Sequence, residues 1–326
     1  MNMSHLLRKC SQSEGKECNS TDSEITVPMS RLRYDRSRRV ETRFIPTTPF
    51  RILDAPGIIN DYYLNLLDWH KETVTIALKD TLYAYSVETK EVNELLSCSG
   101  NNSSYISAIK AFDGKICVGD SLGGIKVFDM GVQKVVGECS MHTTRVCSIS
   151  FNGTVISSGD KGGKIFNSDP RCRKPVAVFE GHSQEVCGLK WRPTVKALDW
   201  CKWKSNILCT GGGSKDKSIR LWDVIGGKEV KRVETDSQVC TLNYLSKYKE
   251  LLTAHGFQQN DLKLWRATGG IKLIKSFGSH DSRILHTAVS PDECTLASLG
   301  ADESLKFWKI GENTKEEVKR DSLSIR

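Results

Sequence analysis

The chain has 326 residues, of which 38% are hydrophobic and 26% charged, the balance of an ordinary globular protein. No apolar run reaches the ~20 residues that a membrane span needs, and the first residues lack the apolar core of a signal peptide. We therefore expect neither a membrane-spanning nor a secreted protein. The formal net charge of +8 is spread along the chain.

Residues 1–50 read as a disordered basic leader and linker, because they are rich in Ser, Arg, Glu and Asn and carry few large apolar residues before Phe44. Six arginines gather between Arg31 and Arg43. No pattern of interleaved aromatic residues accompanies them, so we do not expect nucleic-acid binding.

A repeating unit begins at Leu64. Each unit has an apolar strand, a turn of small residues, a second strand, an Asp/Gly turn and a third strand that ends in an aromatic residue. The clearest example runs from Asn206 to Val224 and includes Trp222-Asp223, the dipeptide that names the WD repeat. A period of ~40 residues predicts an all-β WD-repeat propeller over residues 51–310. There are six complete units. Five of them begin at Leu64, Ser107, Val146, Val239 and Leu285, and the other contains Asn206–Val224.

In the middle of this series, two segments that each have the pattern of the first strand of a repeat unit follow each other directly. Glu185–Trp191 has the pattern of a first strand, and so has Val195–Trp203. The roughly 250 residues from Leu64 to Ile310 give about 41 per repeat for six repeats and about 35 for seven, against the ~40–45 of the WD unit. Six blades are physically allowed. A gene model that lacks one blade is the open alternative.

No group of residues suggests catalysis or a metal site. The sequence has no nucleophile elbow, no phosphate-binding loop and no HExxH motif. The twelve cysteines are scattered, as at Cys187, Cys209 and Cys240, without a CxxC pair, and are expected to be buried thiols in a reducing compartment. His182 follows Gly181 at the usual Gly-His position of the repeat, where a structural role is expected. We predict no enzyme, no cofactor and no metal.

Several strings together resemble the Fizzy family (cell-division-cycle-twenty/Cdh-like), the WD-repeat co-activators of the anaphase-promoting complex, a ubiquitin ligase. The most specific lies in the lead-in segment, Arg51–Trp69, which precedes and enters the first repeat. The resemblance covers about residues 43–310. The matching strings are Leu53-Asp54-Ala55-Pro56, Asn60–Leu66, Gly181–Leu189, Thr210–Gly213, Ser237–Cys240, Lys249–Leu251, His255–Phe257 and Ala301–Glu303.

The resemblance implies two degron sites. A groove between the first and last blades would bind the destruction box, an Arg-x-x-Leu peptide, through Leu53, Asp54, Pro56 and Glu303. The Lys-Glu-Asn degron would bind a face near the propeller axis. Its candidates here are Asp61, Tyr62, Arg283 and, more weakly, Gln238. Family members have seven blades, and the blade absent after Pro193 would carry further polar contacts to this second degron.

Two segments are candidates for docking on the ligase. The flexible tail, residues 311–326, ends in Ile325-Arg326, which is similar to the Ile-Arg tail by which the family binds tetratricopeptide-repeat subunits. Arg43-Phe44-Ile45-Pro46 partly matches the family's C-box, but Thr42 replaces the expected acid. Its position before Arg51 favours a pre-propeller linker over a C-box.

The resemblance thus implies a substrate-recognition and activator subunit that binds the ligase, destruction-box substrates such as cyclins and securin, and spindle-checkpoint proteins. It implies a role in cell division, mitotic or meiotic, in the nucleus and cytoplasm. The alternative is a truncated binding module that holds substrates or checkpoint proteins without activating the ligase. A generic WD scaffold would explain the repeats but not the specific strings.

Overall fold

The computed structural model describes residues 43–98, 104–152, 155–169, 175–180, 186 and 198–311. The leader up to residue 42, the tail from residue 312, and His182 lie outside the described residues. The compact unit that holds the repeats begins at Arg43. Residues 43–50, which we expected to belong to the leader and linker, pack against the propeller.

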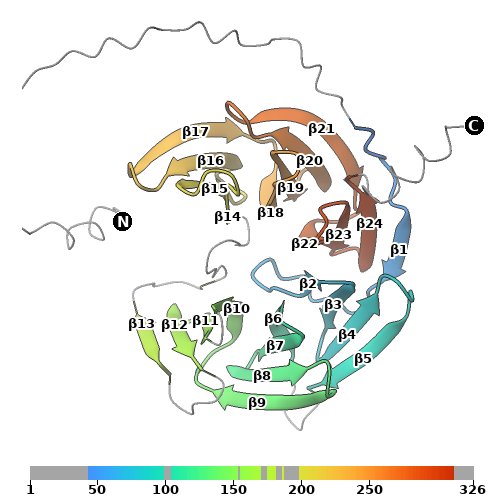
Figure 1. Ribbon diagram of the computed structural model, residues 1–326, viewed down its shortest axis with the longest axis vertical. Coiled ribbons are helices and arrows are strands. Elements are labelled where there is room, and N and C mark those ends of the chain that lie inside the picture. The colour runs from blue at the N-terminus through green and yellow to red at the C-terminus, as the bar shows by residue number, and fades with distance from the viewer. Residues whose placement is uncertain are drawn as a thin grey trace, which may run out of the picture. The chain divides into compact units, whose positions relative to one another are not determined.

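The described residues form strands in six four-stranded antiparallel sheets, which confirms the all-β propeller with six blades (Figure 1). Blade 1 holds β2 (Leu67–His70), β3 (Thr73–Leu78), β4 (Thr81–Ser86) and β5 (Val92–Ser97). Blade 2 holds β6 (Ile106–Phe112), β7 (Lys115–Asp120), β8 (Gly124–Asp129) and β9 (Lys134–Ser140). Blade 3 holds β10 (Val146–Asn152), β11 (Val155–Asp160), β12 (Lys164–Ser168) and β13 (Ala177–Glu180).

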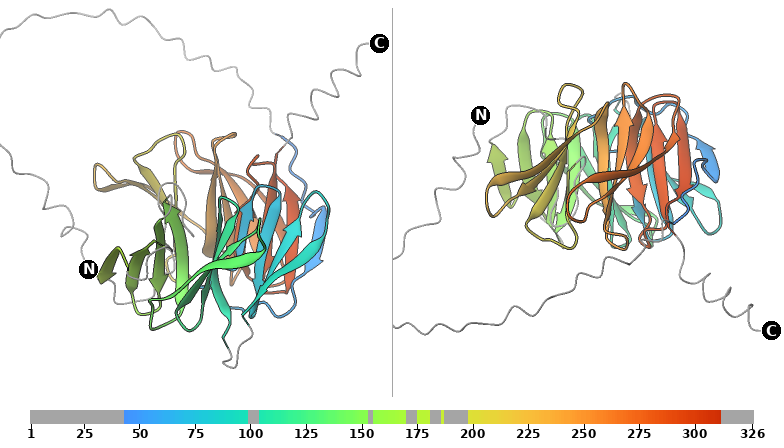
Figure 2. Two further views of the ribbon diagram at one scale, coloured as in Figure 1. Left: turned by 60° about the horizontal axis from the view of Figure 1, so that its bottom comes forward. Right: turned by 90° about the horizontal axis from the view of Figure 1, so that it is seen from above.

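The other three blades complete the series. Blade 4 holds β14 (Leu198–Trp200), β15 (Ile207–Gly211), β16 (Ser218–Asp223) and β17 (Lys228–Glu234). Blade 5 holds β18 (Gln238–Leu245), β19 (Glu250–Gly256), β20 (Asp261–Arg266) and β21 (Lys272–Ser279). Blade 6 holds β22 (Ile284–Val289), β23 (Thr295–Gly300), β24 (Ser304–Lys309) and β1 (Arg51–Asp54). In the turned views the blades stand side by side around the ring (Figure 2).

The aromatic residue that ends the third strand anchors its blade, as the repeat pattern predicts. Trp308 and Trp265 are buried and Trp222 is half-buried. Each indole N–H donates to a hydroxyl on the second strand of the same blade, at 2.8–2.9 Å. Burying the ring while its N–H is satisfied stabilises the blade without leaving a donor unpaired.

The innermost strands of neighbouring blades pack closely at five of the six junctions between the described sheets. The exception is the junction between β10 of blade 3 and β14 of blade 4. Val186, buried at this point, donates its N–H to Asp160 O at 3.0 Å. Val239 makes the equivalent bond to Gly212 O where blade 5 follows blade 4. Val186 therefore lies where a first strand begins, although β14 begins only at Leu198. The remaining residues between them, 187–197, lie outside the described part of the chain.

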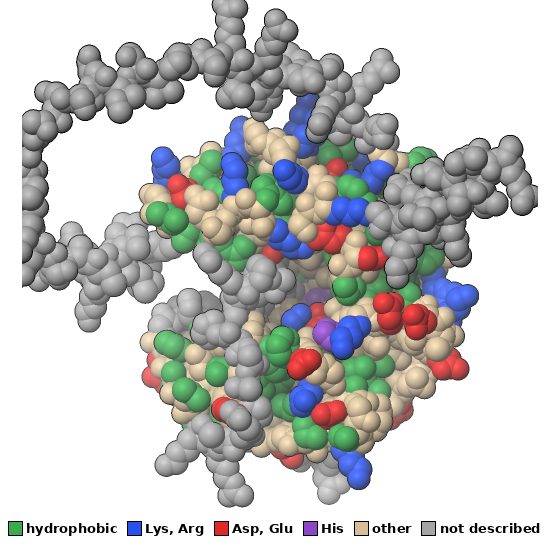
Figure 3. Space-filling model, in the orientation of Figure 1, with side chains coloured by type: hydrophobic (Ala, Val, Ile, Leu, Met, Phe, Trp, Pro, Cys, Tyr) green, Lys and Arg blue, Asp and Glu red, His purple; other side chains and the backbone are tan. Residues whose placement is uncertain are grey.

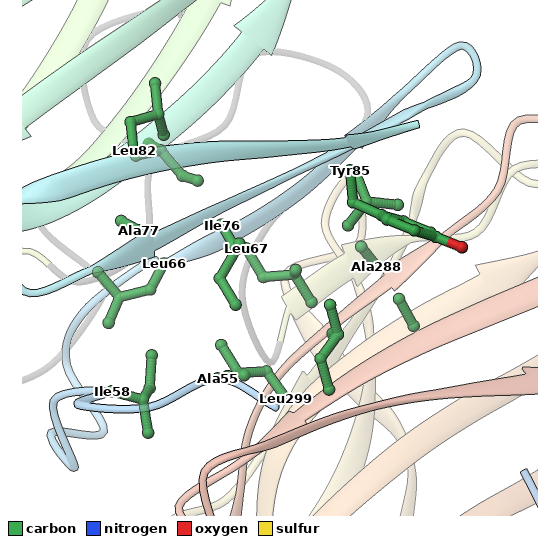
Figure 4. Close-up of a cluster of buried hydrophobic side chains, with 14 of the residues drawn as sticks. Ala55, Ile58, Leu66, Leu67, Ile76, Ala77, Leu82, Tyr85, Ala288 and Leu299 are labelled. Atoms are coloured by element: carbon green, nitrogen blue, oxygen red, sulfur yellow. The ribbon is translucent and has the colours of Figure 1, made fainter. Parts of the chain in front are cut away.

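β1 closes the ring by pairing with β24, in the register Leu53↔Leu305 and Asp54↔Ser304. The lead-in segment then buries Ala55 and Ile58 in a hydrophobic cluster shared by blades 1, 2 and 6 (Figure 4). Removing these side chains from water holds the chain's first strand against its last blade.

Residues 43–50 lie along blades 5 and 6. Ile45 is only 3% exposed and joins the cluster that contains Trp308 and Leu245. Arg43 donates from Nε to Ile310 O at 2.6 Å and from NH2 to the carboxylate of Glu250 at 2.5 Å. Its guanidinium also covers the ring of Tyr248, with Cζ 3.6 Å from the centroid.

Candidate degron-binding site at the seam and the rim

The seam between the first and last strands brings together the four residues expected in the destruction-box groove. Leu53 is half-buried against the core cluster, whereas Asp54, Pro56 and Glu303 are exposed. The carbonyl of Glu303 accepts from Ala55 N at 2.7 Å, and its Oε1 accepts from Gly57 N at 3.1 Å. An exposed carboxylate thus lies beside a partly buried leucine, the combination that an Arg-x-x-Leu peptide would use.

A buried network supports the turn that carries Glu303. His280 Nδ1 lies 3.0 Å from the carboxylate of Asp302, and His280 Nε2 lies 2.7 Å from Ser298 Oγ, which also accepts from Trp308. Burial lowers the pKa of His280 and outweighs the opposing effect of Asp302. Burial would raise the pKa of Asp302, but bonds from Ser304 and His280 outweigh it and lower that pKa to about 2. Asp302 is therefore a charged anchor next to the seam.

We call the edge of the ring where the innermost strands begin the rim. One position of the repeat recurs along it. Tyr105, Arg145, Gln238 and Arg283 each come directly before the fully buried residue near the start of an innermost strand. Because the blades repeat around one axis, equivalent positions face a common centre. The four residues differ in chemistry, as a surface for asymmetric recognition requires. Ala301 N donates to Arg283 O at 2.9 Å, so the rim adjoins the turn of the seam.

The lead-in segment crosses this rim and binds three blades. Asp61 Oδ2 accepts from Arg145 NH1 at 2.7 Å, and the same NH1 donates to the hydroxyl of Tyr105 at 3.2 Å. The hydroxyl of Tyr62 lies 3.5 Å from Val239 O, next to Gln238. The four residues expected on the Lys-Glu-Asn face are therefore joined to one rim.

Arg283 is held at the other end of the segment. It donates from Nε to Asn60 Oδ1 and from NH2 to Asn60 O, each at 2.7 Å. Gln238 is buried, and its Oε1 has no hydrogen-bond partner among the described residues. An unsatisfied buried amide oxygen is costly and is normally explained by a missing partner, such as water or a bound group.

Sequence reasoning missed Asn60, Tyr105 and Arg145 in this site. Arg145 could have been found from the repeat alone, because Thr144-Arg145-Val146 aligns with Ser282-Arg283-Ile284. The position of Asn60 depends on how the lead-in segment folds back over the rim, and no repeat pattern reports that.

Ile325 and Arg326 lie outside the described residues. Arg43 and Ile45 are engaged by the propeller itself, and Phe44 is 81% exposed beside Pro46, an arrangement that favours the linker interpretation of this string.

A cavity of about 320 Å³ lies against the innermost strands, where Figure 3 shows the centre of the ring hollowed on the face it presents. Its lining mixes apolar and polar side chains, and several of the polar ones pair with one another. Thr241 and Asn243 both bond to Thr287 Oγ1, at 2.6 and 2.8 Å, and Lys110 pairs with Asp68 at 2.8 Å.

Within the described part of the chain no cluster of three or more metal-ligating side chains is found. In that same part, no helix has the length and apolar character to span a membrane.

Blades of this pattern, closed by an N-terminal strand, define a WD-repeat β-propeller. The family model "WD domain, G-beta repeat" accordingly matches residues 173–223 and 271–309. The chain is 37% identical to "Anaphase-promoting complex subunit cdc20" of Dictyostelium discoideum, an alignment that covers 85% of this chain and 63% of that protein. It is 35% identical to "Cell division cycle 20.1, cofactor of APC complex" of Arabidopsis thaliana, over 82% and 68%.

A chain in the crystal structure of the mitotic checkpoint complex has the same fold, with a TM-score of 0.78 and 32% identity over 91% of this chain and all of that one. The chain described here therefore belongs to the Cdc20/Fizzy family of WD-repeat co-activators. It spans slightly less than two thirds of the length of the Dictyostelium relative.

Proposed function

We propose that this protein recognises destruction-box substrates for the anaphase-promoting complex. The observation that carries the proposal is the seam, where the pairing of β1 with β24 sets Leu53 beside the turn of Glu303. A leucine of the peptide would be buried at Leu53 and Pro56, and its arginine would meet the carboxylate of Glu303. Burial of a leucine contributes ~1.5–3 kcal/mol and an exposed ion pair only ~0–1, so the apolar contact would dominate affinity.

The rim is proposed as the second degron site. Asp61, Tyr62 and Arg283, with Asn60 and Gln238, present acceptors and donors that can bind a polar peptide such as Lys-Glu-Asn. Family membership supports a role as an adaptor rather than an enzyme. The likeness to a chain of the mitotic checkpoint complex supports spindle-checkpoint proteins as further partners, and action in the nucleus and cytoplasm is part of the same proposal.

A second candidate is a binding module that holds substrates without activating the ligase. The packing of Arg43 and Ile45 favours it, because a string bound to Glu250, Tyr248 and the core is not free to act as a C-box. Both candidates share the degron sites and differ in ligase activation.

Co-precipitation with the purified ligase, followed by a ubiquitination assay on a destruction-box substrate, separates the candidates. An activator binds the ligase and raises substrate ubiquitination. A binding module retains the destruction-box peptide and leaves ubiquitination at its basal rate. A protein that binds no destruction-box peptide fits neither candidate and would contradict the proposal.

A further inference from the structure

The ring of Phe257 and the guanidinium of Arg283 form a cation–π pair on the rim. Cζ of Arg283 lies 5.1 Å from the ring centroid, within the range of a cation–π interaction. Phe257 follows β19 directly and its side chain is 64% exposed. Phe257 belongs to His255-Gly256-Phe257, one of the strings that resemble the Fizzy family.

The backbone of Phe257 is strained. Its φ of +72° lies in the left-handed region, which is a genuine outlier for a bulky aromatic residue and which glycine adopts without such strain. Burial does not explain why phenylalanine is present, because most of the side chain faces solvent. Strain of this kind at an exposed residue points to a use for the side chain itself.

Besides the ring, Asn60 fixes the guanidinium of Arg283 from a second side. Asn60 accepts from Nε and NH2, as described above. Gly256 gives Arg283 room, because a Cβ at this position would lie 2.8 Å from Arg283 Cβ and 3.0 Å from Cys240 Sγ. NH1 of Arg283 makes no hydrogen bond to any described residue. The guanidinium is thus oriented on two sides and keeps one donor nitrogen for a ligand.

We propose that Phe257 is a positioning residue for degron recognition: its ring holds the guanidinium of Arg283 so that NH1 can donate to an acceptor oxygen of the bound peptide. This inference rests on the proposed rim site. Phe257 itself need not contact the side chains of the degron. A preorganised guanidinium loses less conformational freedom on binding than a mobile one, so the ring raises affinity without itself reading the peptide.

Peptide titration of the full chain tests this role with two matched substitutions. Phe257→Tyr keeps the ring, and we expect it to bind a Lys-Glu-Asn peptide within twofold of wild type. Phe257→Gly removes the ring and relieves the backbone strain. We expect it to bind that peptide at least fivefold more weakly, to bind a destruction-box peptide unchanged, and to melt at the same or a higher temperature. Equal Lys-Glu-Asn binding by wild type and Phe257→Gly would overturn the proposal, as would equal losses in Phe257→Gly and Phe257→Tyr.

A measurement on the free protein separates this inference from the function on which it rests. The Nε–H signal of Arg283, assigned in NMR spectra by its loss in Arg283→Lys, should exchange slowly with water in wild type and in Phe257→Tyr and faster in Phe257→Gly. If wild type binds no Lys-Glu-Asn peptide but this pattern holds, the rim site is wrong and the positioning of Arg283 stands. If exchange is the same in all three proteins, the positioning role is wrong whatever the peptide does.

Discussion

Glu303 is tied to Gly57 by a hydrogen bond of 3.1 Å from the backbone N–H of Gly57 to Oε1 of the carboxylate. The carbonyl of Glu303 also accepts from Ala55 N. The acid that we expect to face a peptide arginine therefore also fastens the lead-in segment to the last blade. Its charge and its acceptor role can be separated by substitution.

Glu303→Gln should weaken destruction-box binding only modestly, by at most about fivefold, because an exposed ion pair contributes ~0–1 kcal/mol and glutamine keeps an acceptor for Gly57. Glu303→Ala should weaken binding further and lower the melting temperature, since it also removes the bond to the lead-in segment. Fluorescence titration and thermal melts of both variants measure the two effects. Identical behaviour of Gln and Ala would show that the bond to Gly57 is unimportant.

Leu53→Arg should abolish destruction-box binding, because it replaces the apolar contact that we expect to contribute ~1.5–3 kcal/mol with a charge. The matched control is Ile52→Arg in the same strand. Ile52 is 55% exposed and points to the opposite face, so its substitution should leave peptide binding intact. Undiminished binding by Leu53→Arg, or equal losses in both variants, would refute the groove.

The Lys-Glu-Asn degron should bind at least tenfold more weakly than to a seven-bladed relative, a difference of about 1.4 kcal/mol. The missing blade removes polar partners, and each degron group left buried and unpaired costs ~1–3 kcal/mol. Destruction-box binding uses the seam between β1 and β24 and should be preserved. Titration of both peptides against both propellers gives the comparison. Equal Lys-Glu-Asn affinities would mean that the missing blade supplies nothing essential.

Deletion of Ile325 and Arg326 should reduce co-precipitation with the ligase and leave destruction-box binding unchanged. The guanidinium of Arg326 can make charge-assisted bonds, and the side chain of Ile325 can fill an apolar pocket. A weak tail contact adds avidity only beside a second contact, so the loss should be larger at low protein concentration. Normal co-precipitation of the truncated chain would exclude the tail as an anchor.

Acid should destabilise the propeller through Glu293, which joins three blades. Its carboxylate accepts from Lys202 Nζ at 2.8 Å, from Ser246 Oγ at 2.7 Å and from Lys247 N at 2.9 Å. Burial would raise its pKa, but these bonds outweigh burial and lower the pKa from 4.5 to about 2. Because the folded pKa lies below the unfolded one, the stabilisation is complete above about pH 5 and is lost as the pH falls toward 2.

The expected loss is at most roughly 3 kcal/mol of unfolding free energy from this one group. Glu293→Gln should be less stable at neutral pH and show a shallower decline between pH 5 and 2. Urea unfolding at stepped pH measures both. Parallel pH curves for the two proteins would show that Glu293 does not contribute to acid sensitivity.

The sequence predicted the blades well because their signals are local. Alternation within Asn206–Val224 is enough to identify β15 and β16, and the recurrence of Trp222, Trp265 and Trp308 marks equivalent third strands. The seam could also be proposed from the sequence, because the strings around Leu53 and Glu303 carry the resemblance to the family. Its geometry then follows from closure by the first strand.

Other features depend on contacts between residues far apart in the chain. Nothing in the sequence near Arg43 reveals that its partners are Glu250 and the carbonyl of Ile310, so the linker was assigned to the leader. The bond of Asp61 to Arg145 likewise spans the rim. Such pairs become visible only once the ring is closed.

The pairing of β1 with β24 also has a consequence for how this protein is made. β1 is the first of the described strands to be synthesised, yet its partner, Ser304–Lys309, follows some 250 residues later. At ~5–20 residues per second, β1 waits for roughly 12–50 seconds without its partner strand. During that interval the edge of the nascent chain is open to wrong pairing. We expect propeller formation to be largely post-translational, and the time before closure to be when the chain depends most on chaperones.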